Sequence, residues 1–417
     1  MKELPKGWER ATVGQLGDYW NGRGFKKSEW RESGRPIIRI QNLTGSGASF
    51  NYFQGEADDR HIARHGDLLV SWAATLGVYE WKGPEAVVNQ HIFKVESRID
   101  KKLHRYLLDH ILKDLQAKTH GSGMVHITRN RFDETQVIVP SSNDEQQRIV
   151  EVIEEQFSRL DAGVESLQRA KRNLTRLRAS LLSAAVEGRL IPSDATSPPA
   201  VEEATQIASD EAGVVVVPAG WSLVRLGSIA SMSLGKMLDH KRQTGAHPVR
   251  YLRNVNVRWF GFDLSDLALM DVAPSEFERV SVQSGDLVVC EGGEPGRCAV
   301  WRGDPVAIQK ALHRVRPVEG VLAEYLAIVL RWWVDRTEME RFITGTTIKH
   351  VPKEKLRLLP IPLPPADEQG RIVAEVERQF SILDAMAKTI DAGLQRAGAL
   401  RRSILSQAFS GRLTGAA

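Results

Sequence analysis

The stretch Asp-Glu-Gln-Gln-Arg-Ile-Val at Asp144–Val150 decides the fold, because it returns as Asp-Glu-Gln-Gly-Arg-Ile-Val at Asp367–Val373. After each copy, apolar residues follow at alternating steps of three and four for roughly five heptads, which predicts a long helix with a coiled-coil stripe. About 45 residues at ~1.5 Å each give rods of roughly 65–70 Å. The predicted stripe residues are Ile153, Phe157, Leu160, Val164, Leu167, Leu174 and Leu181 in the first helix, and Val376, Phe380, Leu383, Ile390, Leu394 and Ile404 in the second.

Other segments repeat in the same order along the whole chain. Chance matches do not keep their order over half a chain, so the order indicates a tandem duplication. Each copy opens with Pro-x-Gly-Trp and closes with Gly-Arg-Leu. The matched segments are Pro5–Trp8 with Pro218–Trp221, Gly66–Val70 with Gly285–Val289, Gly121–Ile127 with Gly345–Val351, and Gly188–Leu190 with Gly411–Leu413.

The part of each copy that precedes the helix is rich in short β-branched runs bounded by Gly and Pro, which predicts a mixed α+β domain. The expected strands are Pro36–Leu43, Asp67–Ser71 and Gln136–Val139 in the first copy, and Val249–Val257, Asp286–Val289 and Leu358–Leu363 in the second; helices are expected at His104–Lys118 and Ala323–Arg341.

The predicted fold class is therefore α+β, with two similar mixed α/β domains separated by two long antiparallel helices that form a coiled coil with pseudo-two-fold symmetry. A segment with three prolines, five acidic residues and no basic ones joins the two copies as a solvated linker. The expected division is a first domain at 1–143, a first helix at 144–190, the acidic linker at 191–217, a second domain at 218–366 and a second helix at 367–417.

Composition limits the possible functions. Lys and Arg number 56 and Asp and Glu 52, so the net charge is +4, which excludes a densely acidic DNA mimic. The two cysteines, Cys290 and Cys298, exclude a disulfide scaffold and a four-cysteine zinc site. No secretory signal or bilayer-length apolar run occurs, which predicts a cytoplasmic protein. Phosphate-loop, amino-methyltransferase and His-Glu-x-x-His motifs do not occur, so we expect no catalysis and no cofactor or metal in this chain.

On these residues the sequence resembles the specificity subunit of a type I restriction–modification system. The likeness rests on the Pro-x-Gly-Trp openings, the Asp-Glu-Gln-x-Arg-Ile-Val helix starts and the closing Gly-Arg-Leu, and it covers the whole chain. The resemblance implies two target-recognition domains, each of which reads one half of a bipartite site in double-stranded DNA. It also implies a helical spacer that sets the gap and docks two methyltransferase subunits, in a complex with restriction/translocase subunits.

Comparison of the two copies divides the candidate DNA contacts into side chains that recur in both copies and side chains that differ between them. Side chains that recur, such as Asn42 with Asn254 and His126 with His350, favour a role in the fold or in phosphate contact. Side chains that differ at matching places favour base reading, since Arg and Lys donate to guanine whereas Asn and Gln bond adenine. The differing sets are Arg39 and Gln41 against Tyr251 and Arg253, Asn89 and Gln90 against Gln309 and Lys310, Thr75 against Glu294, and Val125 against Lys349.

Basic residues in matching polar loops are the candidates for phosphate contact, with a merely solvated loop as the alternative at each position. The phosphate candidates are Lys26, Lys27, Lys236, Lys241 and Arg242, and Arg250 and Thr346 complete the predicted DNA contacts. Arginines such as Arg172 and Arg176 form either a solvated face or a docking face of the rods, and Val186 and Phe409 are apolar residues that a partner could cover. Two other functions stay open, a stand-alone bipartite DNA-binding protein and a coiled-coil scaffold that contacts only protein.

Overall fold

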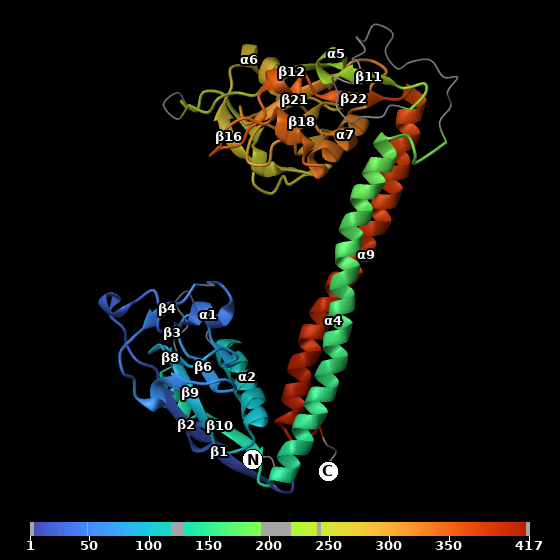
Figure 1. Cartoon of the computed structure of the whole chain (residues 1–417). Helices are drawn as coiled ribbons and strands as arrows, with labels where there is room; N and C mark the ends of the chain where they lie inside the picture. The colour runs from blue at the N-terminus through green and yellow to red at the C-terminus, as the bar shows by residue number, and fades with distance from the viewer. Residues whose placement is uncertain (1–3, 48, 118–127, 193–217, 240–242, 414–417) are drawn as a thin grey trace. The chain divides into compact units, whose positions relative to one another are not determined.

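A computed structural model describes residues 4–47, 49–117, 128–192, 218–239 and 243–413. The chain divides into two compact units, one of Met1–Gln168 with Asp391–Ala417 and one of Arg169–Ile390. Each unit holds one mixed α/β domain together with antiparallel segments of two long helices, α4 (Asn143–Val186) and α9 (Ala366–Ala408) (Figure 1).

The domain of the first unit contains two four-stranded sheets and one strand pair. The strand orders are β2-β9-β6-β7 and β4-β3-β8-β5, and β1 pairs with β10. The strands are β1 (Trp8–Thr12), β2 (Gly17–Asn21), β3 (Arg35–Ile38), β4 (Asn51–Phe53), β5 (Ile62–Ala63), β6 (Leu68–Ser71), β7 (Gly77–Glu80), β8 (Ala86–Val88), β9 (Ile92–Ser97) and β10 (Gln136–Pro140); the helices are α1 (Ile40–Thr44), α2 (Lys101–Ala117) and α3 (Arg129–Asp133), with short 3-10 turns at Val13–Gln15, Lys27–Glu29 and Asp59–His61.

The domain of the second unit has the same sheets in the same strand orders, β12-β21-β18-β19 and β16-β13-β20-β17, and the pair β11-β22. It adds one hairpin, β14 (Val257–Arg258) with β15 (Gly261–Phe262). The other elements are β11 (Ser222–Arg225), α5 (Leu226–Ile229), β12 (Ala230–Leu234), β13 (Pro248–Leu252), β16 (Ala268–Asp271), α6 (Pro274–Val280), β17 (Ser281–Val282), β18 (Leu287–Cys290), β19 (Cys298–Val300), β20 (Val306–Ile308), β21 (Leu312–Pro317), α7 (Ala323–Asp335), α8 (Lys353–Leu356) and β22 (Pro360–Leu363), with 3-10 turns at Asn254–Asn256 and Glu338–Phe342.

Two expected strands are shorter than predicted for a shared reason. The segments Pro36–Leu43 and Val249–Val257 each leave the sheet after their first half, at Ile38 and Leu252. Just beyond these strand ends, the backbone amide of Arg39 donates to the side chain of Asn42, and the amide of Arg253 donates to that of Asn256. Such local turns compete with the sheet for the backbone. The predicted helix Ala323–Arg341 is also too long, since α7 ends at Asp335 and Thr337 is left-handed at φ 59°.

Equivalent contacts pair the long helices in both units. Arg401 donates to Asp161 at 2.7 Å and covers the ring of Phe157 at 4.0 Å. In the second unit, Arg178 pairs with Asp384 and covers the ring of Phe380 at 5.6 Å. These residues correspond one to one between the two copies, so the same antiparallel register holds in each unit. Every residue of the predicted stripe is buried or half-buried.

The repeated end motifs close each unit. Gly411 and Gly188 are left-handed at φ 69° and 67°, the conformation that glycine adopts most easily after a helix end. A Cβ on Gly411 would lie 2.4 Å from Cγ of Pro5, and one on Gly188 equally close to Pro218. Each Pro-x-Gly-Trp motif therefore packs on the end of the helix from the other copy. Val186 and Phe409 are buried in these contacts, so the expectation that a partner covers them is wrong.

The recurring Asp-Glu-Gln motif ties each long helix to its domain through the glutamine. Gln146 accepts from the amide of Asp100 at 2.8 Å and donates to the Pro140 carbonyl at 3.0 Å. Gln369 accepts from the amide of Leu322 at 2.8 Å and donates to Pro364 and to Gly320. Both glutamines are buried, so their hydrogen bonds fix the direction in which each helix leaves its domain.

Candidate nucleic-acid interface

Three chain segments meet at one junction in the first domain. The amide of Arg23 donates to Val88, the amide of Gln90 donates to Arg23, and the amide of Asn89 donates to Ile38. A Cβ on Gly22 would lie 2.3 Å from the carbonyl oxygens of both Val88 and Asn89, so only glycine allows this approach. The junction places the segment after β8 beside the ends of β2 and β3.

The second domain repeats this junction bond for bond. The amide of Lys236 donates to Ile308 at 2.8 Å, that of Lys310 to Lys236 at 2.9 Å, and that of Gln309 to Leu252 at 3.0 Å. Gln90 and Lys310 therefore occupy equivalent positions, and both are exposed. The same backbone arrangement therefore exposes the side-chain amide of Gln90 in the first domain and the side-chain ammonium group of Lys310 in the second.

The same geometry corrects the expected match between Asn42 and Asn254. Asn42 accepts from the amide of Arg39 at 3.0 Å, and Asn256 accepts from that of Arg253 at 2.9 Å. Asn256 is therefore the counterpart of Asn42, and Arg39 corresponds to Arg253 rather than to Tyr251. The Arg-x-x-Asn spacing, present in both copies, is the sequence signal that could have found this pair.

Asn256 organises the loop that follows β13. Its side-chain amide donates to the carbonyls of Asp263 at 3.0 Å and Asp266 at 2.9 Å, and the residue is only 2 % exposed. Asn42 makes the corresponding bonds to Gly47 at 3.2 Å and Ser49 at 3.0 Å. Both asparagines act on loop shape, which agrees with a role in the fold rather than in base contact.

Carboxylates neutralise several basic groups of the second domain. Lys236 pairs with Glu276 at 2.5 Å, Arg253 with Asp266 at 2.7 Å and Lys349 with Glu340 at 2.9 Å. Hydrogen bonds from Lys236 and then Arg279 hold the pKa of the Glu276 carboxyl below its usual value, so this carboxylate is charged at neutral pH. Such partly exposed pairs contribute only about 0–1 kcal/mol, so a phosphate group can compete for the cation.

The segment Thr344–His350 forms a tight loop beside this junction in the second unit. The amides of Thr344 and His350 exchange hydrogen bonds at 2.8 and 3.0 Å, and His350 forms a bridge with Gly292. The tip exposes Thr346 and Lys349 together with Ile348, which is 75 % exposed. Ile348 was not predicted from the sequence, because apolar character alone does not mark a loop tip.

Thr75 lies in the loop after β6 in the first domain. The hydroxyl of Ser71 donates to the Thr75 carbonyl at 2.5 Å, and Ala74 is left-handed at φ 58°. The rings of Trp72 and His91 lie 5.6 Å apart, which links this loop to the segment with Asn89 and Gln90. Neither Trp72 nor His91 was selected from the sequence. Both residues belong to ring contacts, Trp72 with His91 and with Phe93.

The remaining predicted residues divide by position. Lys26 and Lys27 are exposed at the turn after β2, and Gln41 is half-buried in α1. Arg250 lies within β13, paired with Leu269, and is not at the junction. His126, Lys241 and Arg242 lie outside the described residues.

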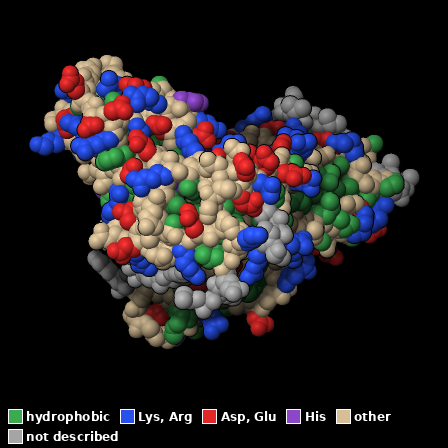
Figure 2. Space-filling model, turned by 90° about the horizontal axis from the view of Figure 1, so that it is seen from below, with side chains coloured by type: hydrophobic (Ala, Val, Ile, Leu, Met, Phe, Trp, Pro, Cys, Tyr) green, Lys and Arg blue, Asp and Glu red, His purple; other side chains and the backbone are tan. Residues whose placement is uncertain are grey.

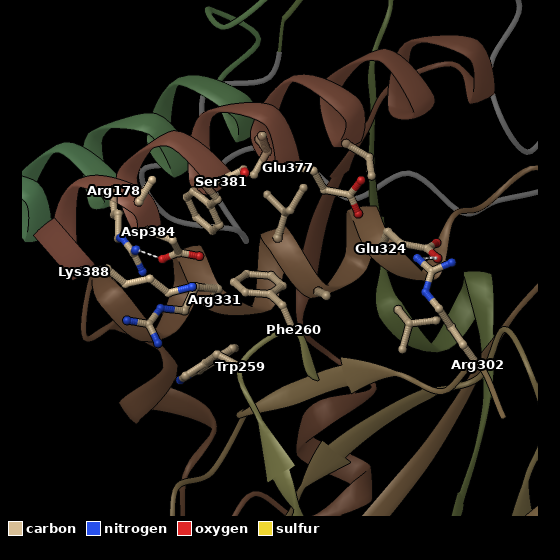
Figure 3. Close-up of a pocket in the computed structure, with 17 residues that line it drawn as sticks. Arg178, Trp259, Phe260, Arg302, Glu324, Arg331, Glu377, Ser381, Asp384 and Lys388 are labelled. Carbon is tan, nitrogen blue, oxygen red and sulfur yellow. Dashed lines mark hydrogen bonds and ion pairs between the residues drawn. The ribbon is translucent and has the colours of Figure 1, made fainter. Parts of the chain in front are cut away.

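The second unit also contains a cleft that the sequence did not reveal. A space of about 900 Å³ lies between α9 and the β14–β15 hairpin, and Trp259 and Phe260 of the hairpin turn line it together with Ser381 and Asp384 of α9 (Figure 3). Phe260 is left-handed at φ 62°, and its ring lies 5.6 Å from that of Phe380. Arg331 covers the Trp259 ring at 4.5 Å. The lining arginines Arg178, Arg302 and Arg331 are each ion-paired, and the ring contact of Phe260 with Phe380 joins the hairpin to α9.

The surface is mixed in charge. Figure 2 shows Lys and Arg interspersed with Asp and Glu over the face that it presents. Within the described ranges, no group of three or more His, Cys, Asp or Glu is arranged to hold a metal ion. Among the same residues, no helix has the length and apolar character needed to cross a bilayer.

Comparison with known proteins identifies the family. The family described as type I restriction modification DNA specificity domain matches twice, at residues 5–172 and 218–396, and the chain belongs to this family. The chain is 26 % identical to the type I restriction enzyme EcoBI specificity subunit of Escherichia coli, over 98 % of this chain and 86 % of that protein. It is 22 % identical to the EcoKI specificity subunit of Escherichia coli strain K12, over 99 % and 90 %.

Solved structures share the fold. A chain from a structure described as the basis of complex assembly and conformational transition of the type I R-M system superposes with a TM-score of 0.73 at 17 % identity, covering 99 % of this chain and 100 % of that chain. The HsdS subunit from Thermoanaerobacter tengcongensis gives a TM-score of 0.54 at 19 % identity, covering 99 % and 98 %. The predicted class, two mixed α/β domains with two long antiparallel helices, is confirmed.

Proposed function

We propose that this chain is the non-catalytic DNA-specificity subunit of a cytoplasmic type I restriction–modification complex. Each domain reads one half of a bipartite site in double-stranded DNA, and the paired helices set the unread gap and dock two methyltransferase subunits. Restriction/translocase subunits complete the assembly. The named relatives are specificity subunits, which supports this assignment.

The observation that carries the proposal is the duplicated junction. Gln90 and Lys310 stand exposed on the same backbone frame but differ in chemistry. A glutamine can bond the adenine edge through two hydrogen bonds, whereas a lysine donates to the acceptors of guanine. Two matched frames that carry different side chains suit a target whose two halves differ in sequence.

The first test measures assembly and methylation together. We expect the tagged chain, expressed together with a type I methyltransferase subunit, to retain that enzyme and to direct adenine methylation to a split motif. DNA binding should weaken steeply with salt, because phosphate contacts release counterions. Tight sequence-specific binding by the chain alone would favour a stand-alone regulator. A complete lack of salt-dependent DNA binding, with or without the enzyme, would favour a protein scaffold.

The junction itself is tested by Gln90→Ala and Lys310→Ala. Each variant should relax base preference at a position in one half of the methylated motif and leave the other half intact. The expected discrimination lost is about 1–3 kcal/mol at that position. Arg302→Ala is a control in the second domain, since Arg302 is ion-paired with Glu324 at 2.8 Å and is not among the predicted DNA contacts. Loss of preference in both halves from either substitution would count against the proposal.

A further inference from the structure

The Thr344–His350 loop projects an isoleucine side chain into solvent. Ile348 is 75 % exposed, and among the described residues no other large apolar side chain is more exposed. Its neighbours at the tip, Thr346, Thr347 and Lys349, are polar and exposed as well. Single exposed apolar side chains are common on protein surfaces, so the support and the position of Ile348 decide whether it has a role.

Hydrogen bonds within the loop hold it in one shape. The amides of Thr344 and His350 bond to each other's carbonyls, and the His350 ring adds a contact on each side. Its Nδ1 lies 3.3 Å from the Ile348 carbonyl oxygen, and its Nε2 lies 3.1 Å from the Thr344 hydroxyl. Gly345 is left-handed at φ 91°, and a Cβ on it would lie 2.1 Å from the Ile348 carbonyl oxygen. Only glycine allows so sharp a turn, and the loop presents Ile348 on a fixed support.

The end of the loop is anchored beside the junction of the second domain. Val351 is fully buried, and its carbonyl accepts a hydrogen bond from the ring of buried His313 at 2.9 Å. The amide of Val351 donates to Glu291 at 2.8 Å, and the amide of Glu291 donates to Ala311 at 2.8 Å. One hydrogen-bonded segment therefore separates the loop from the exposed Lys310, which directly precedes Ala311.

Lys310 and Ile348 are close enough to meet the same stretch of DNA. Hydrogen-bonded segments lie about 4.8 Å apart, and one residue spans at most ~3.4 Å along the chain. The path from Lys310 through Glu291 and Val351 to Ile348 is therefore no longer than about 25 Å. That distance corresponds to roughly seven base pairs of a duplex.

Both copies of the sequence have an apolar residue at this place. Gly121–Ile127 matches Gly345–Val351, and Met124 stands where the second copy has Ile348. An apolar residue that recurs, and that the core of the second domain does not bury, favours a contact made outside the chain. The inference concerns the second domain alone, since Met124 lies outside the described residues.

We propose that Ile348 is a wedge that inserts against one base step in or beside the second half-site and unstacks it. The inference rests on the proposed function. Apolar side chains such as Ile and Met can enter between stacked bases and kink the duplex. Lys349 and the hydroxyls of Thr346 and Thr347 bind the phosphates that flank the step. Because pyrimidine–purine steps unstack most easily, the wedge adds sequence preference at a step whose bases it does not hydrogen-bond.

The experiment uses the full chain in complex with type I methyltransferase subunits, bound to duplexes that carry its methylated motif. 2-Aminopurine placed beside one step near the second half-site, away from the methylated adenine, should gain fluorescence on binding because the base is unstacked. Ile348→Ala should remove at least about half of that gain and weaken binding at least about tenfold, since three alkyl carbons are lost from the contact. Ile348→Leu keeps the alkyl volume and should preserve both.

Duplexes in which that step is varied give a second readout. The unchanged chain should prefer a pyrimidine–purine step, and Ile348→Ala should flatten the preference. Val318→Ala is the control, since Val318 is 40 % exposed in the same domain but follows the far end of β21. This variant should change neither fluorescence nor affinity, and circular dichroism checks that every variant is folded.

Other outcomes overturn the proposal. Unchanged fluorescence, affinity and step preference in Ile348→Ala would refute the wedge and leave the proposed function standing. Weaker binding that disappears when one thymine is replaced by uracil, without a change in fluorescence, would assign Ile348 to a thymine methyl group instead. Release of the methyltransferase subunits by Ile348→Ala would assign the side chain to a protein contact. Absence of DNA binding by the complex of the unchanged chain would refute the proposed function as well.

Discussion

Replacement of Asn256 by alanine should loosen the loop that follows β13 without unfolding the domain. The side chain makes three hydrogen bonds, at 2.9, 3.0 and 2.9 Å, to the backbone of Arg253, Asp263 and Asp266. At about 0.5–1.5 kcal/mol for each bond, the loss is roughly 1.5–4.5 kcal/mol of local stability. The buried position keeps water from replacing these bonds, which favours the upper half of that range.

Hydrogen exchange measured by mass spectrometry is the suitable assay, because it reports the opening of one segment. Peptides that cover residues 253–266 should exchange about 10- to 1,000-fold faster in Asn256→Ala, since each 1.4 kcal/mol is a factor of ten. Asn254→Ala is the matched control, as the structure gives its side chain no comparable set of backbone bonds. Equal exchange in the two variants would refute the reasoning. Methylation should lose fidelity only in the half-site of the second domain.

Three further predictions concern stability. Gly411→Ala should lower the melting temperature more than Gly245→Ala: both glycines are left-handed, but only a Cβ on Gly411 meets Pro5, and equal shifts would contradict this packing. Burial lowers the pKa of His104 to about 4, so its neutral form stabilises the fold above pH 6.5 and that contribution is lost as pH falls toward 4. Urea unfolding should show this slope, and His104→Gln should flatten it; an unchanged slope would contradict the assignment. A double-mutant cycle on Arg401 and Asp161 should give a coupling of about 0.2–1 kcal/mol, and additive losses would show that the pair does not set the register.

The sequence predicted the large elements well because their signals are long and periodic. The apolar stripe in each long helix and the duplicated motifs did not depend on tertiary context. The repeated Gly-Arg-Leu closings singled out Gly188 and Gly411, and both glycines are left-handed just beyond the helix ends. The partners of these glycines, Pro5 and Pro218, were beyond prediction, because a sequence does not show that each helix end packs on the domain of the other copy.

The candidate site was harder to predict, since it depends on short irregular segments. Apolar runs at Pro36–Leu43 and Val249–Val257 suggested whole strands, and the capping asparagines that end them are local features of weak sequence signal. The mismatch of Asn254 with Asn42 followed from this error. Ion pairs such as that of Lys236 with Glu276 join residues forty positions apart, so no local sequence pattern could predict them.

The central claim is that each domain reads its own half of one DNA site. The most direct measurement replaces residues 1–143, or separately 218–366, with the matching domain of a relative that has another target, and maps methylated adenines across the genome. The claim predicts that each exchange changes one half of the split motif and preserves the other half and the gap. An exchange of either domain that altered both halves would contradict it.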